Sequence, residues 1–427
     1  MIVKAPGSFS RRVSPLRMKT MNTVSLFTLL RECGPHSRSD LARISRLSKP
    51  TVSEQVADLL SRGLVLEVGQ PESVTRRGKK PTLLRFNKDC GLVIAASIST
   101  STVKVWEARL DGSIANQAEV RIRPELGPEF VINTLKEAIR SVLQSAAAVP
   151  PHRRLISVSV PGLVDARNGI VLETDNVFGW RDVSLGSALH WEFGVPVVVD
   201  NDVNLAVLAE ARYGGGRGEQ IFGLIQLDTG IGLGICLNGS PYHGQHWAAG
   251  EIAHMVPGSS IMGVSSGDRG HLESIVAMDR VTERIRQLAR SSPGPLAELL
   301  KSKPPLQALL QAASQGQKPA EEFIQELAGV LGAAIANVSA CYDPGKIILL
   351  GPLFTALFDR IRPVFESVIR WPVKLELSNV GEDVSLRGAL VAGLTRIFDR
   401  LENELESAAP PAQAVPAAEA VGERAIR

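Results

Sequence analysis

The sequence predicts an α/β protein, with a small helical module at its N-terminus followed by a much larger α/β body. Three observations lead to this prediction. Residues 21–60 carry apolar side chains at helical spacing, residues 61–88 have the pattern of a β-hairpin, and strand-like and helix-like segments alternate from residue 91 onward. The 427 residues, 44% of them hydrophobic, are enough to form sizeable cores in two or three domains.

The N-terminal module begins with two predicted helices. Asn22 is a candidate N-cap of the first helix, whose apolar face comprises Val24, Leu26, Phe27, Leu29 and Leu30. Ser37 and Asp40 have the spacing of a capping box, which predicts a short second helix over Arg38–Ile44. The turn Ser45-Arg46-Leu47 then leads into a third helix.

Ser48 can cap this third helix, and Pro50 lies in its first turn, where a missing N–H group costs nothing. The core-facing positions are Val52, Val56, Leu59 and Leu60, and the opposite face near the N-terminal end carries Lys49, Thr51, Ser53, Glu54 and Gln55. This arrangement is typical of a recognition helix, whose first turns reach base edges in the major groove. We therefore predict DNA contacts by Ser48, Lys49, Thr51, Ser53 and Gln55.

The predicted hairpin, with strands over Leu64–Val68 and Thr82–Phe86, has a basic tip. Its cations suit phosphates or a minor groove and are Arg76, Arg77, Lys79 and Lys80. Residues 1–90 hold 17 Lys and Arg against 7 Asp and Glu, a net charge of +10, whereas the rest of the chain has a net charge of −7. The capped helices, the basic tip and this charge together favour DNA binding over a solvated basic loop or a protein-interaction module.

The two ends of the chain are expected to lack regular structure. Residues 1–20 predict a flexible basic arm, and the Ala- and Pro-rich residues 407–427 predict a disordered tail. No run of about 18 uncharged apolar residues is present, and the basic N-terminus lacks the apolar core of a secretory signal. The four cysteines form no Cys-x-x-Cys pair, which is typical of reduced thiols, so we expect a cytoplasmic protein.

The body contains a series of motifs in a fixed order: Pro161-Gly162-Leu163-Val164-Asp165, Gly179-Trp180, Asp200-Asn201-Asp202, Asp228-Thr229-Gly230-Ile231-Gly232-Leu233-Gly234, Ala249-Gly250-Glu251-Ile252-Ala253-His254, Gly267-Asp268-Arg269-Gly270-His271-Leu272-Glu273 and Ile348-Leu349-Leu350-Gly351. This series resembles the ROK family (repressors, open reading frames, kinases), which has the two-lobed fold of sugar kinases and actin-like ATPases. The N-terminal module resembles the winged helix-turn-helix of the family's repressors of the xylose and N-acetylglucosamine type. The resemblance covers about residues 20–402 and implies a winged helix over 21–88 and a ROK domain over 89–406.

A polyol-binding pocket is expected in the body. Val197-Val198-Val199 predicts a buried strand that delivers Asn201 and Asp202 to its C-terminal end, where open α/β sheets bind ligands. The resemblance implies that Asp202 matches the residue that deprotonates the sugar hydroxyl in family kinases, and that Asn201, Glu251, His254 and Glu273 match residues that hold other hydroxyls. Asn176 is either a pocket residue or simply a turn residue before Gly179.

Three departures from the family pattern fall at its nucleotide contacts. The kinases' Asp-x-Gly-Gly-Thr stretch is matched by Ser97, Ile98, Ser99, Thr100 and Ser101, which lack the metal-binding carboxylate and both glycines. Asp228 replaces a glycine in the other phosphate loop, where a carboxylate repels a triphosphate. Leu350-Gly351 replaces the Gly-Gly on the adenosine side. We therefore expect no kinase activity, no catalytic residue and no cofactor.

The family's structural zinc site is also altered. The resemblance places Val264, Ser266 and His271 at its three cysteine positions, and His254 at its histidine. Valine cannot bind zinc and serine is a poor ligand for it, so we expect no metal, although a remodelled site with His254, His271 and an acid remains an alternative.

These features together predict a sugar-responsive transcriptional regulator, most simply a repressor, with operator DNA and a sugar or sugar derivative as partners. Such a protein binds DNA as a homodimer or homotetramer. The late helix predicted over Ser385–Leu401 is expected to pack on the first lobe and to pass the ligand state to the winged helix. The alternatives are a sugar kinase with a DNA-binding domain and a DNA-binding protein whose body is a ligand-free dimerisation scaffold.

Overall fold

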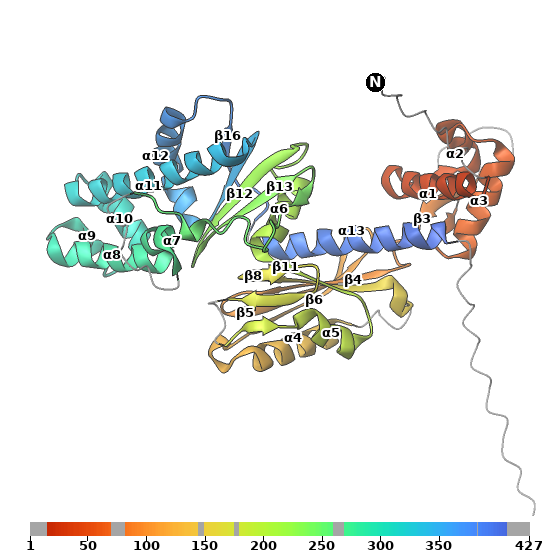
Figure 1. The fold of residues 1–427 in the computed structure, drawn as a ribbon, viewed down its shortest axis with the longest axis horizontal. Helices are drawn as coiled ribbons and strands as arrows, with labels where there is room; N and C mark the ends of the chain where they lie inside the picture. The colour runs from red at the N-terminus through yellow and green to blue at the C-terminus, as the bar shows by residue number, and fades with distance from the viewer. Residues whose placement is uncertain are drawn as a thin grey trace, which may run out of the picture. The chain divides into compact units, whose positions relative to one another are not determined.

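A computed structural model of the chain describes residues 15–69, 82–143, 149–174, 179–258, 269–381 and 383–407. The chain divides into two compact units, one formed by residues 1–90 and 398–427 and the other by residues 91–397. The last helix, α13 (Val384–Glu406), contributes residues to both units. The elements are labelled in Figure 1.

The first unit contains three helices and a small antiparallel sheet. The helices are α1 (Pro15–Cys33), α2 (Arg38–Ser45) and α3 (Lys49–Ser61). The strands β1 (His36–Ser37), β2 (Val65–Val68) and β3 (Leu83–Phe86) lie in the order β1-β3-β2. The three predicted helices and the hairpin strands are thus confirmed, and β1 is an additional strand that the sequence did not reveal. The hairpin tip, with Arg76, Arg77, Lys79 and Lys80, lies outside the described residues.

The start of α1 corrects one prediction. The helix begins at Pro15 and not after Asn22, so Asn22 is an interior helical residue and residues 15–20 are not an unstructured arm. The early turns are held against α3, because Lys19 Nζ donates a hydrogen bond to Glu54 Oε1 at 2.7 Å and Thr23 Oγ1 donates one to Gln55 Oε1. These partners lie more than 30 residues away along the chain, which is why the local pattern did not predict the longer helix.

Two of the three predicted caps in the first unit, those at Ser37 and Ser48, are present. Ser37 and Asp40 form the capping box of α2, and the Ser48 side chain accepts a hydrogen bond from the Thr51 amide at the start of α3. The core between the helices and the sheet is fully buried and includes Leu26, Phe27, Leu30, Leu41, Val52, Val56, Leu59 and Leu84. The last turns of α13 complete this core: the Phe398 ring contacts the Phe86 ring, and the Arg31 guanidinium lies 4.3 Å from the centre of the Phe398 ring.

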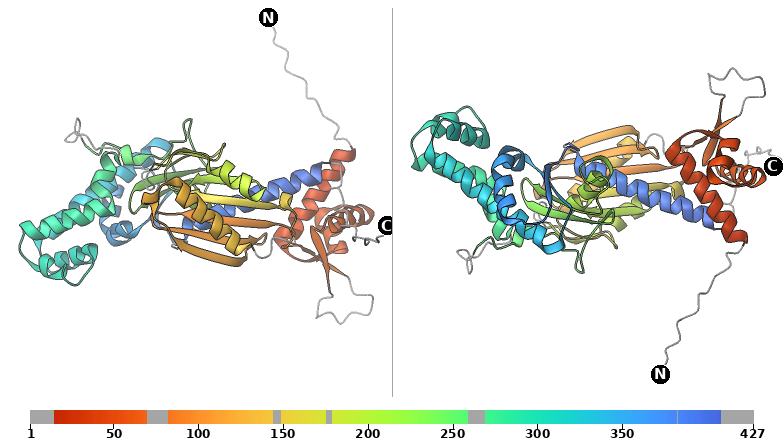
Figure 2. Two further views of the ribbon diagram at one scale, coloured as in Figure 1. Left: turned by 90° about the horizontal axis from the view of Figure 1, so that it is seen from below. Right: turned by 90° about the horizontal axis from the view of Figure 1, so that it is seen from above.

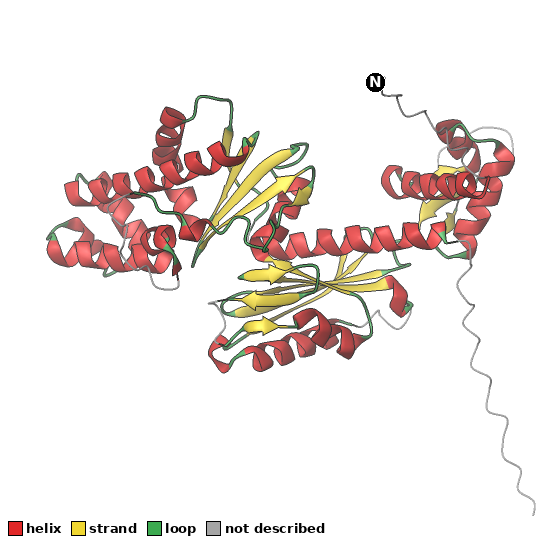
Figure 3. Cartoon of the chain, viewed as in Figure 1, coloured by secondary structure: helices red, strands yellow, loops and turns green. Residues whose placement is uncertain are grey.

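The second unit contains two five-stranded sheets, seen in Figure 3 as two groups of yellow strands. The first sheet has the order β11-β7-β4-β5-β6, in which β4, β7 and β11 are parallel and β5 and β6 are antiparallel additions. The strands are β4 (Leu92–Ile98), β5 (Thr102–Arg109), β6 (Ile114–Arg121), β7 (Arg154–Val160) and β11 (Val197–Asn201). Helix α4 (Pro128–Val142) packs on β5 and β6, and α5 (Leu185–Phe193) packs near β11. A small sheet of β8 (Leu163–Asp165), β9 (Ile170–Glu173) and β10 (Arg181–Val183) adjoins β11.

The second sheet has the order β14-β13-β12-β15-β16. Its strands are β12 (Ile221–Leu227), β13 (Ile231–Leu237), β14 (Ser240–Pro241), β15 (Lys346–Leu350) and β16 (Lys374–Leu377). Helix α6 (Asp202–Tyr213) covers one face of this sheet. On the other face, α7 (His271–Val276), α11 (Lys318–Tyr342) and α12 (Pro352–Val368) share a core with the sheet. Helices α8 (Met278–Ser291), α9 (Pro295–Leu299) and α10 (Pro305–Ser314) pack on one another and on α7 and α11. Figure 2 shows α11 and α12 beside this second sheet in both views.

Helix α11 is long and apolar enough to cross a membrane, judged by length and composition only. In the structure its apolar residues are core residues of the second sheet's lobe. Leu327, Leu331 and Ile335 are at most 1% exposed and belong to the cluster that includes Ile347 and Leu349 of β15. The helix is therefore accounted for as part of a packed core.

The predicted late helix is α13, and two glycines allow its close packing within the second unit. A Cβ atom at Gly388 would lie 1.8 Å from the Leu205 carbonyl oxygen of α6, and one at Gly393 would lie 2.5 Å from the Val93 side chain of β4. Lys104 of β5 donates a hydrogen bond to Asp383, just before α13, at 2.8 Å. The helix thus packs against both α6 and the first sheet, next to the point where the chain passes from one lobe to the other.

Candidate ligand cleft and DNA-binding face

The centre of the candidate site is the junction of β11 and α6. Asn201 ends the strand and caps the helix: its Oδ1 accepts hydrogen bonds from the amides of Val203 and Asn204 at 2.9 and 3.1 Å. Its Nδ2 donates to the Gly162 carbonyl oxygen at 2.8 Å. The Asn201 side chain is therefore fixed in place by the protein itself, and the residue lines the cavity.

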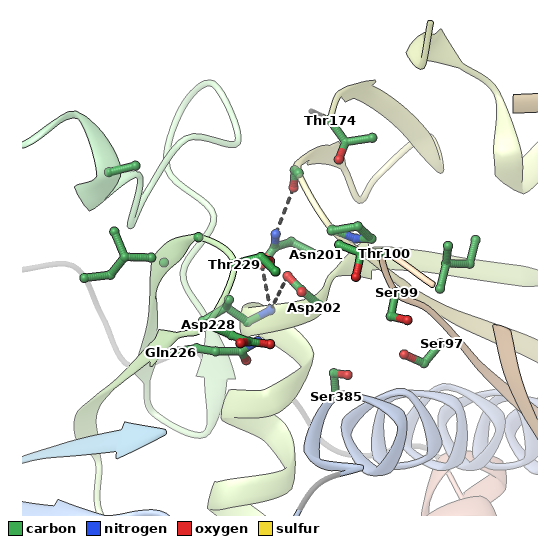
Figure 4. A pocket seen from close by; sticks show the side chains of 18 of the residues that line it. Ser97, Ser99, Thr100, Thr174, Asn201, Asp202, Gln226, Asp228, Thr229 and Ser385 are labelled. Carbon is green, nitrogen blue, oxygen red and sulfur yellow. Dashed lines mark hydrogen bonds between the residues drawn. The ribbon is translucent and has the colours of Figure 1, made fainter. Parts of the chain in front are cut away.

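Asp202 is the first residue of α6 and lines the same cavity (Figure 4). Burial raises the pKa of its carboxyl to about 6, and the nearby negative charge of Glu251 acts in the same direction. The Val203 amide, which donates to Asp202 Oδ1 at 2.9 Å, partly opposes this shift. A carboxyl group with this pKa can accept hydrogen bonds from a hydroxyl or take up a proton near neutral pH.

The other three predicted pocket residues come from the second lobe. Glu251 precedes a short 3-10 turn over Ile252–His254, His254 is the last residue of that turn, and Glu273 lies in the first turn of α7. Glu273 Oε2 accepts a hydrogen bond from the Ile231 amide at 3.0 Å, which fixes the carboxylate beside the turn between β12 and β13. All five predicted residues line one cavity of about 470 Å³ within the second unit. Asn176 lies outside the described residues.

A pair behind β11, formed by buried Asp200 and half-buried His243, was missed by the sequence reasoning. Asp200 accepts a hydrogen bond from the Asn201 amide at 2.7 Å through Oδ1 and is bonded to His243 Nε2 at 2.8 Å through Oδ2. The Asp200 carboxylate raises the pKa of His243, and desolvation opposes this only in part. The pair ties the loop after β14 to the strand end that carries Asn201 and Asp202. Its only sequence signal is an acid next to Asn201, since His243 is 43 residues away.

The part of the cavity that faces β4 is rich in hydroxyl groups. Ser97, Thr100 and Ser385 line it, and Figure 4 shows them on the same side of Asp202. Ser99 is used within its own turn, where its Oγ accepts a hydrogen bond from the Thr102 amide at 3.0 Å. Gln226, from the middle strand of the second sheet, presents a buried Oε1 that has no hydrogen-bond partner within the described part of the chain. Of these residues, Ser97, Ser99 and Thr100 belong to the stretch that the family resemblance aligned with a phosphate-binding loop, whereas Gln226 and Ser385 were not predicted.

The altered zinc positions are only partly visible. His254 and His271 are described, whereas Val264 and Ser266 lie outside the described residues. No group of three or more His, Cys, Asp or Glu side chains that could hold a metal ion occurs among the residues for which the structure gives positions. The absence of zinc therefore stays a prediction.

The candidate DNA-binding face is the N-terminal end of α3. Ser48, Lys49 and Ser53 are exposed there, and Thr51 is half-buried beside its partner Ser48. The predicted exposure of Gln55 is wrong. Gln55 is 1% exposed and is hydrogen-bonded to Thr23 of α1, because position 55 lies at helical spacing from Val52 and Leu59 on the core face. Gln55 is thus a core residue and is no longer a candidate for base contact.

The arrangement of the second unit defines its class. Two α/β lobes enclose a polar cleft, with carboxylates at a strand end and a late helix packed against the first lobe, which is the architecture of sugar kinases and actin-like ATPases. The ROK family profile matches residues 108–392, two thirds of the chain, and the chain belongs to the ROK family.

Similar proteins of this family include regulators and kinases. The xylose repressor of Caldicellulosiruptor bescii is 26% identical over 370 residues, which cover 83% of this chain and 90% of the repressor. The crystal structure of a ROK family transcriptional regulator, a homologue of the Escherichia coli Mlc protein, superposes with a TM-score of 0.72 and 25% identity over 91% of this chain and 99% of that chain. A ROK family glucokinase from Streptomyces griseus, in complex with glucose and AMPPNP, has a TM-score of 0.57 and 25% identity over 71% of this chain and 99% of the kinase.

Proposed function

We propose that this protein is a sugar-responsive DNA-binding transcriptional regulator that acts as a repressor. The observation that carries the proposal is the extent of the similarity. The two regulators match more than four fifths of this chain. The glucokinase matches only 71% of this chain, although 99% of the kinase is included in the match. The part of this chain that the glucokinase does not match is long enough to include the first unit. The order of three helices and two hairpin strands in that unit supports a winged helix.

The proposed DNA contacts are the exposed residues at the start of α3 and the basic hairpin tip. Ser48, Lys49, Thr51 and Ser53 are proposed to face the major groove, and Arg76, Arg77, Lys79 and Lys80 are proposed to contact phosphates or the minor groove. A single winged helix reads only a short half-site, so we propose that the protein acts in the cytoplasm as a homodimer or homotetramer on a two-fold related operator.

The proposed effector site is the cleft lined by Asn201, Asp202, Glu251, His254 and Glu273. Such a set of carboxylates, an amide and an imidazole offers hydrogen-bond acceptors and donors at several angles, which is what a polyol requires. We propose that no phosphoryl transfer takes place there. Ser97 offers no carboxylate to a metal ion, and Asp228 adds negative charge at the position of a phosphate loop.

Helix α13 supplies a route by which ligand binding can alter DNA binding. Ser385, in its first turn, lines the cleft, and Phe398, near its end, packs against Phe86 of the first unit. A sugar that binds one arrangement of the two lobes more tightly than another increases the population of the arrangement it prefers, to an extent set by the difference in affinity. Because α13 packs against the lobes, its position changes with their arrangement. The first unit then experiences that shift through the same helix.

The proposal is tested with the full-length chain. Protein is incubated with a library of genomic DNA fragments, the bound fragments are sequenced, and the affinity for the enriched site is measured by fluorescence anisotropy with and without candidate sugars. We expect one enriched, two-fold related sequence and a change in affinity with at least one sugar. The variants Lys49→Ala and Ser53→Ala should weaken or redirect binding, whereas the control Lys301→Ala, an exposed lysine of the second unit, should not.

Two outcomes would replace the proposal. Enrichment of no sequence, together with ATP-dependent phosphorylation of a sugar in a coupled assay, would establish the kinase alternative. Sequence-specific binding that no sugar changes and no sugar-dependent thermal shift would instead support a ligand-free scaffold.

A further inference from the structure

The candidate cleft is larger than one sugar ring requires, and part of it is lined by hydroxyl groups. Its volume of about 470 Å³ corresponds to roughly 15 water molecules at about 30 Å³ each. A single pyranose has fewer carbon and oxygen atoms than that, and covalent bonds pack them more closely than water. One ring held by Asp202, Glu251, His254 and Glu273 therefore leaves part of the cavity unfilled.

The unfilled part is lined by several uncharged polar side chains, besides charged groups. Ser97 and Thr100 come from the end of β4 and the turn after it, Ser385 comes from α13, and Gln226 comes from β12. Within the described part of the chain, the hydroxyls of Ser97, Thr100 and Ser385 make no hydrogen bond to another residue. Hydroxyl and amide groups that face a cavity in this way can each donate to and accept from a polyol.

The charges of the cleft select against an anionic ligand. Five carboxylates line it, from Asp202, Asp228, Glu251, Glu273 and Asp383, against the two cations Lys104 and Arg269. Both cations are already paired: Lys104 binds Asp383 at 2.8 Å, and Arg269 binds Asp279 at 2.6 Å. Neither is available to neutralise a phosphate without breaking an ion pair, and the remaining carboxylates repel one.

Resting on the proposed function, we propose that the cleft has two adjoining sugar subsites and that its effector is an uncharged disaccharide or longer oligosaccharide. The first ring occupies the subsite of Asp202, Glu251, His254 and Glu273. The second ring occupies the subsite of Ser97, Thr100, Gln226 and Ser385, where a kinase would bind phosphate. Because Ser385 belongs to α13, the second ring contacts the helix that extends into the first unit.

The wild-type protein is tested first with matched probes. Binding of xylose, glucose and N-acetylglucosamine is compared by isothermal titration calorimetry with binding of xylobiose, cellobiose and N,N′-diacetylchitobiose, and with glucose 6-phosphate and ATP. We expect one disaccharide to bind at least about tenfold more tightly than its own monosaccharide, as about one additional net hydrogen bond provides. We expect glucose 6-phosphate to bind more weakly than glucose, and ATP not to bind.

Variants then test whether the higher affinity for a disaccharide comes from the second subsite. The triple variant Ser97→Ala, Thr100→Val, Ser385→Ala removes three hydroxyls with little change in volume, and should reduce the disaccharide-to-monosaccharide affinity ratio to about one-tenth or less of the wild-type ratio. Ser385→Ala alone serves as the milder variant, with a smaller reduction in the same direction. Thr134→Val, which removes a hydroxyl bonded only within α4, is the matched control and should keep the wild-type ratio.

The outcomes separate this inference from the proposed function. If a monosaccharide and its disaccharide bind equally, or if the triple variant keeps the wild-type ratio, the second subsite is refuted while sugar sensing stands. If glucose 6-phosphate or ATP binds more tightly than every neutral probe, the charge argument is refuted. If no probe binds and DNA binding responds to none of them, the proposed function itself fails.

Discussion

Replacing Asp202 by asparagine should stabilise the free protein while weakening its response to sugar. Burial raises the pKa of Asp202 from 3.8 to about 6, so the ionised carboxylate is disfavoured in the folded protein. The folded protein therefore favours the protonated carboxyl. The free energy of unfolding that this preference contributes is present in full below about pH 4 and is lost as pH rises through about 6. At 1.36 kcal/mol per pKa unit, the loss is about 3 kcal/mol at pH 8.

Asparagine keeps the shape and the acceptor for the Val203 amide, and it carries no charge at any pH. Asp202→Asn should therefore be more stable than the wild type by up to about 3 kcal/mol at pH 8, and equally stable near pH 4. For the 307 residues of unit two, at about 2.1 cal/mol/K per residue, this corresponds to a rise of about 5 °C in the melting temperature. Differential scanning calorimetry between pH 4 and 8 measures the difference. Asp228→Asn, an exposed carboxylate of the same cavity, is the control and should change little.

The same substitution should reduce sugar affinity about tenfold or more, because an amide replaces a charge-assisted acceptor for a ligand hydroxyl. DNA affinity without sugar should stay near the wild-type value, since the residue lies in the second unit. An Asp202→Asn protein that is no more stable than the wild type at pH 8 would refute the buried-carboxylate reasoning. An unchanged sugar response would remove Asp202 from the pocket.

Three further predictions concern the first unit and the metal. Gln55→Ala should lower the free energy of unfolding by about 1–3 kcal/mol in urea titrations, because it removes the buried partner of Thr23 and leaves space in the core; a changed DNA sequence preference at normal stability would contradict the burial of Gln55. Replacing Arg76 and Arg77 by alanine should weaken binding to all DNA sequences and flatten its salt dependence, whereas Ser53→Ala should alter sequence preference; an unchanged salt slope in the double variant would count against a phosphate-binding tip. Elemental analysis after dialysis should find no stoichiometric zinc, and about one zinc per chain, lost together with stability on chelation, would overturn that expectation.

The sequence predicted the cleft better than it predicted the DNA-binding face, for a physical reason. A buried strand followed by Asn201 and Asp202 fixes where those side chains lie, because the strand end and the helix start leave few alternatives. At position 55 of α3 the sequence favours two opposite predictions. Glutamine is usually exposed, but its spacing from Val52 and Leu59 is that of a buried core residue. The deciding contact comes from Thr23, more than 30 residues earlier, and no local pattern contains it. The Asp200–His243 pair was missed for the same reason.

The glycines of the cleft bear on the proposal that it binds no nucleotide. Gly230, Gly232 and Gly234 remain in the loop and strand after Asp228, and from sequence they could be taken as a retained phosphate loop. In the structure, added Cβ atoms would lie 2.7 Å from Glu273 Oε2 at Gly230, 3.1 Å from the Val203 side chain at Gly232, and 2.4 Å from the Val207 side chain at Gly234. At Gly234 the added atom would also lie 2.8 Å from the Val203 carbonyl oxygen, so packing against α6 requires glycine there without any nucleotide, and the close contacts at Gly230 and Gly232 favour glycine in the same way. The glycines whose role in the kinases is to approach phosphate have meanwhile become Ser99 and Thr100. Glycine thus occurs here at positions that close packing explains, and Ser99 and Thr100 stand at positions where glycine would serve only the approach of a phosphate, which supports the proposal of a cleft for a sugar without a nucleotide.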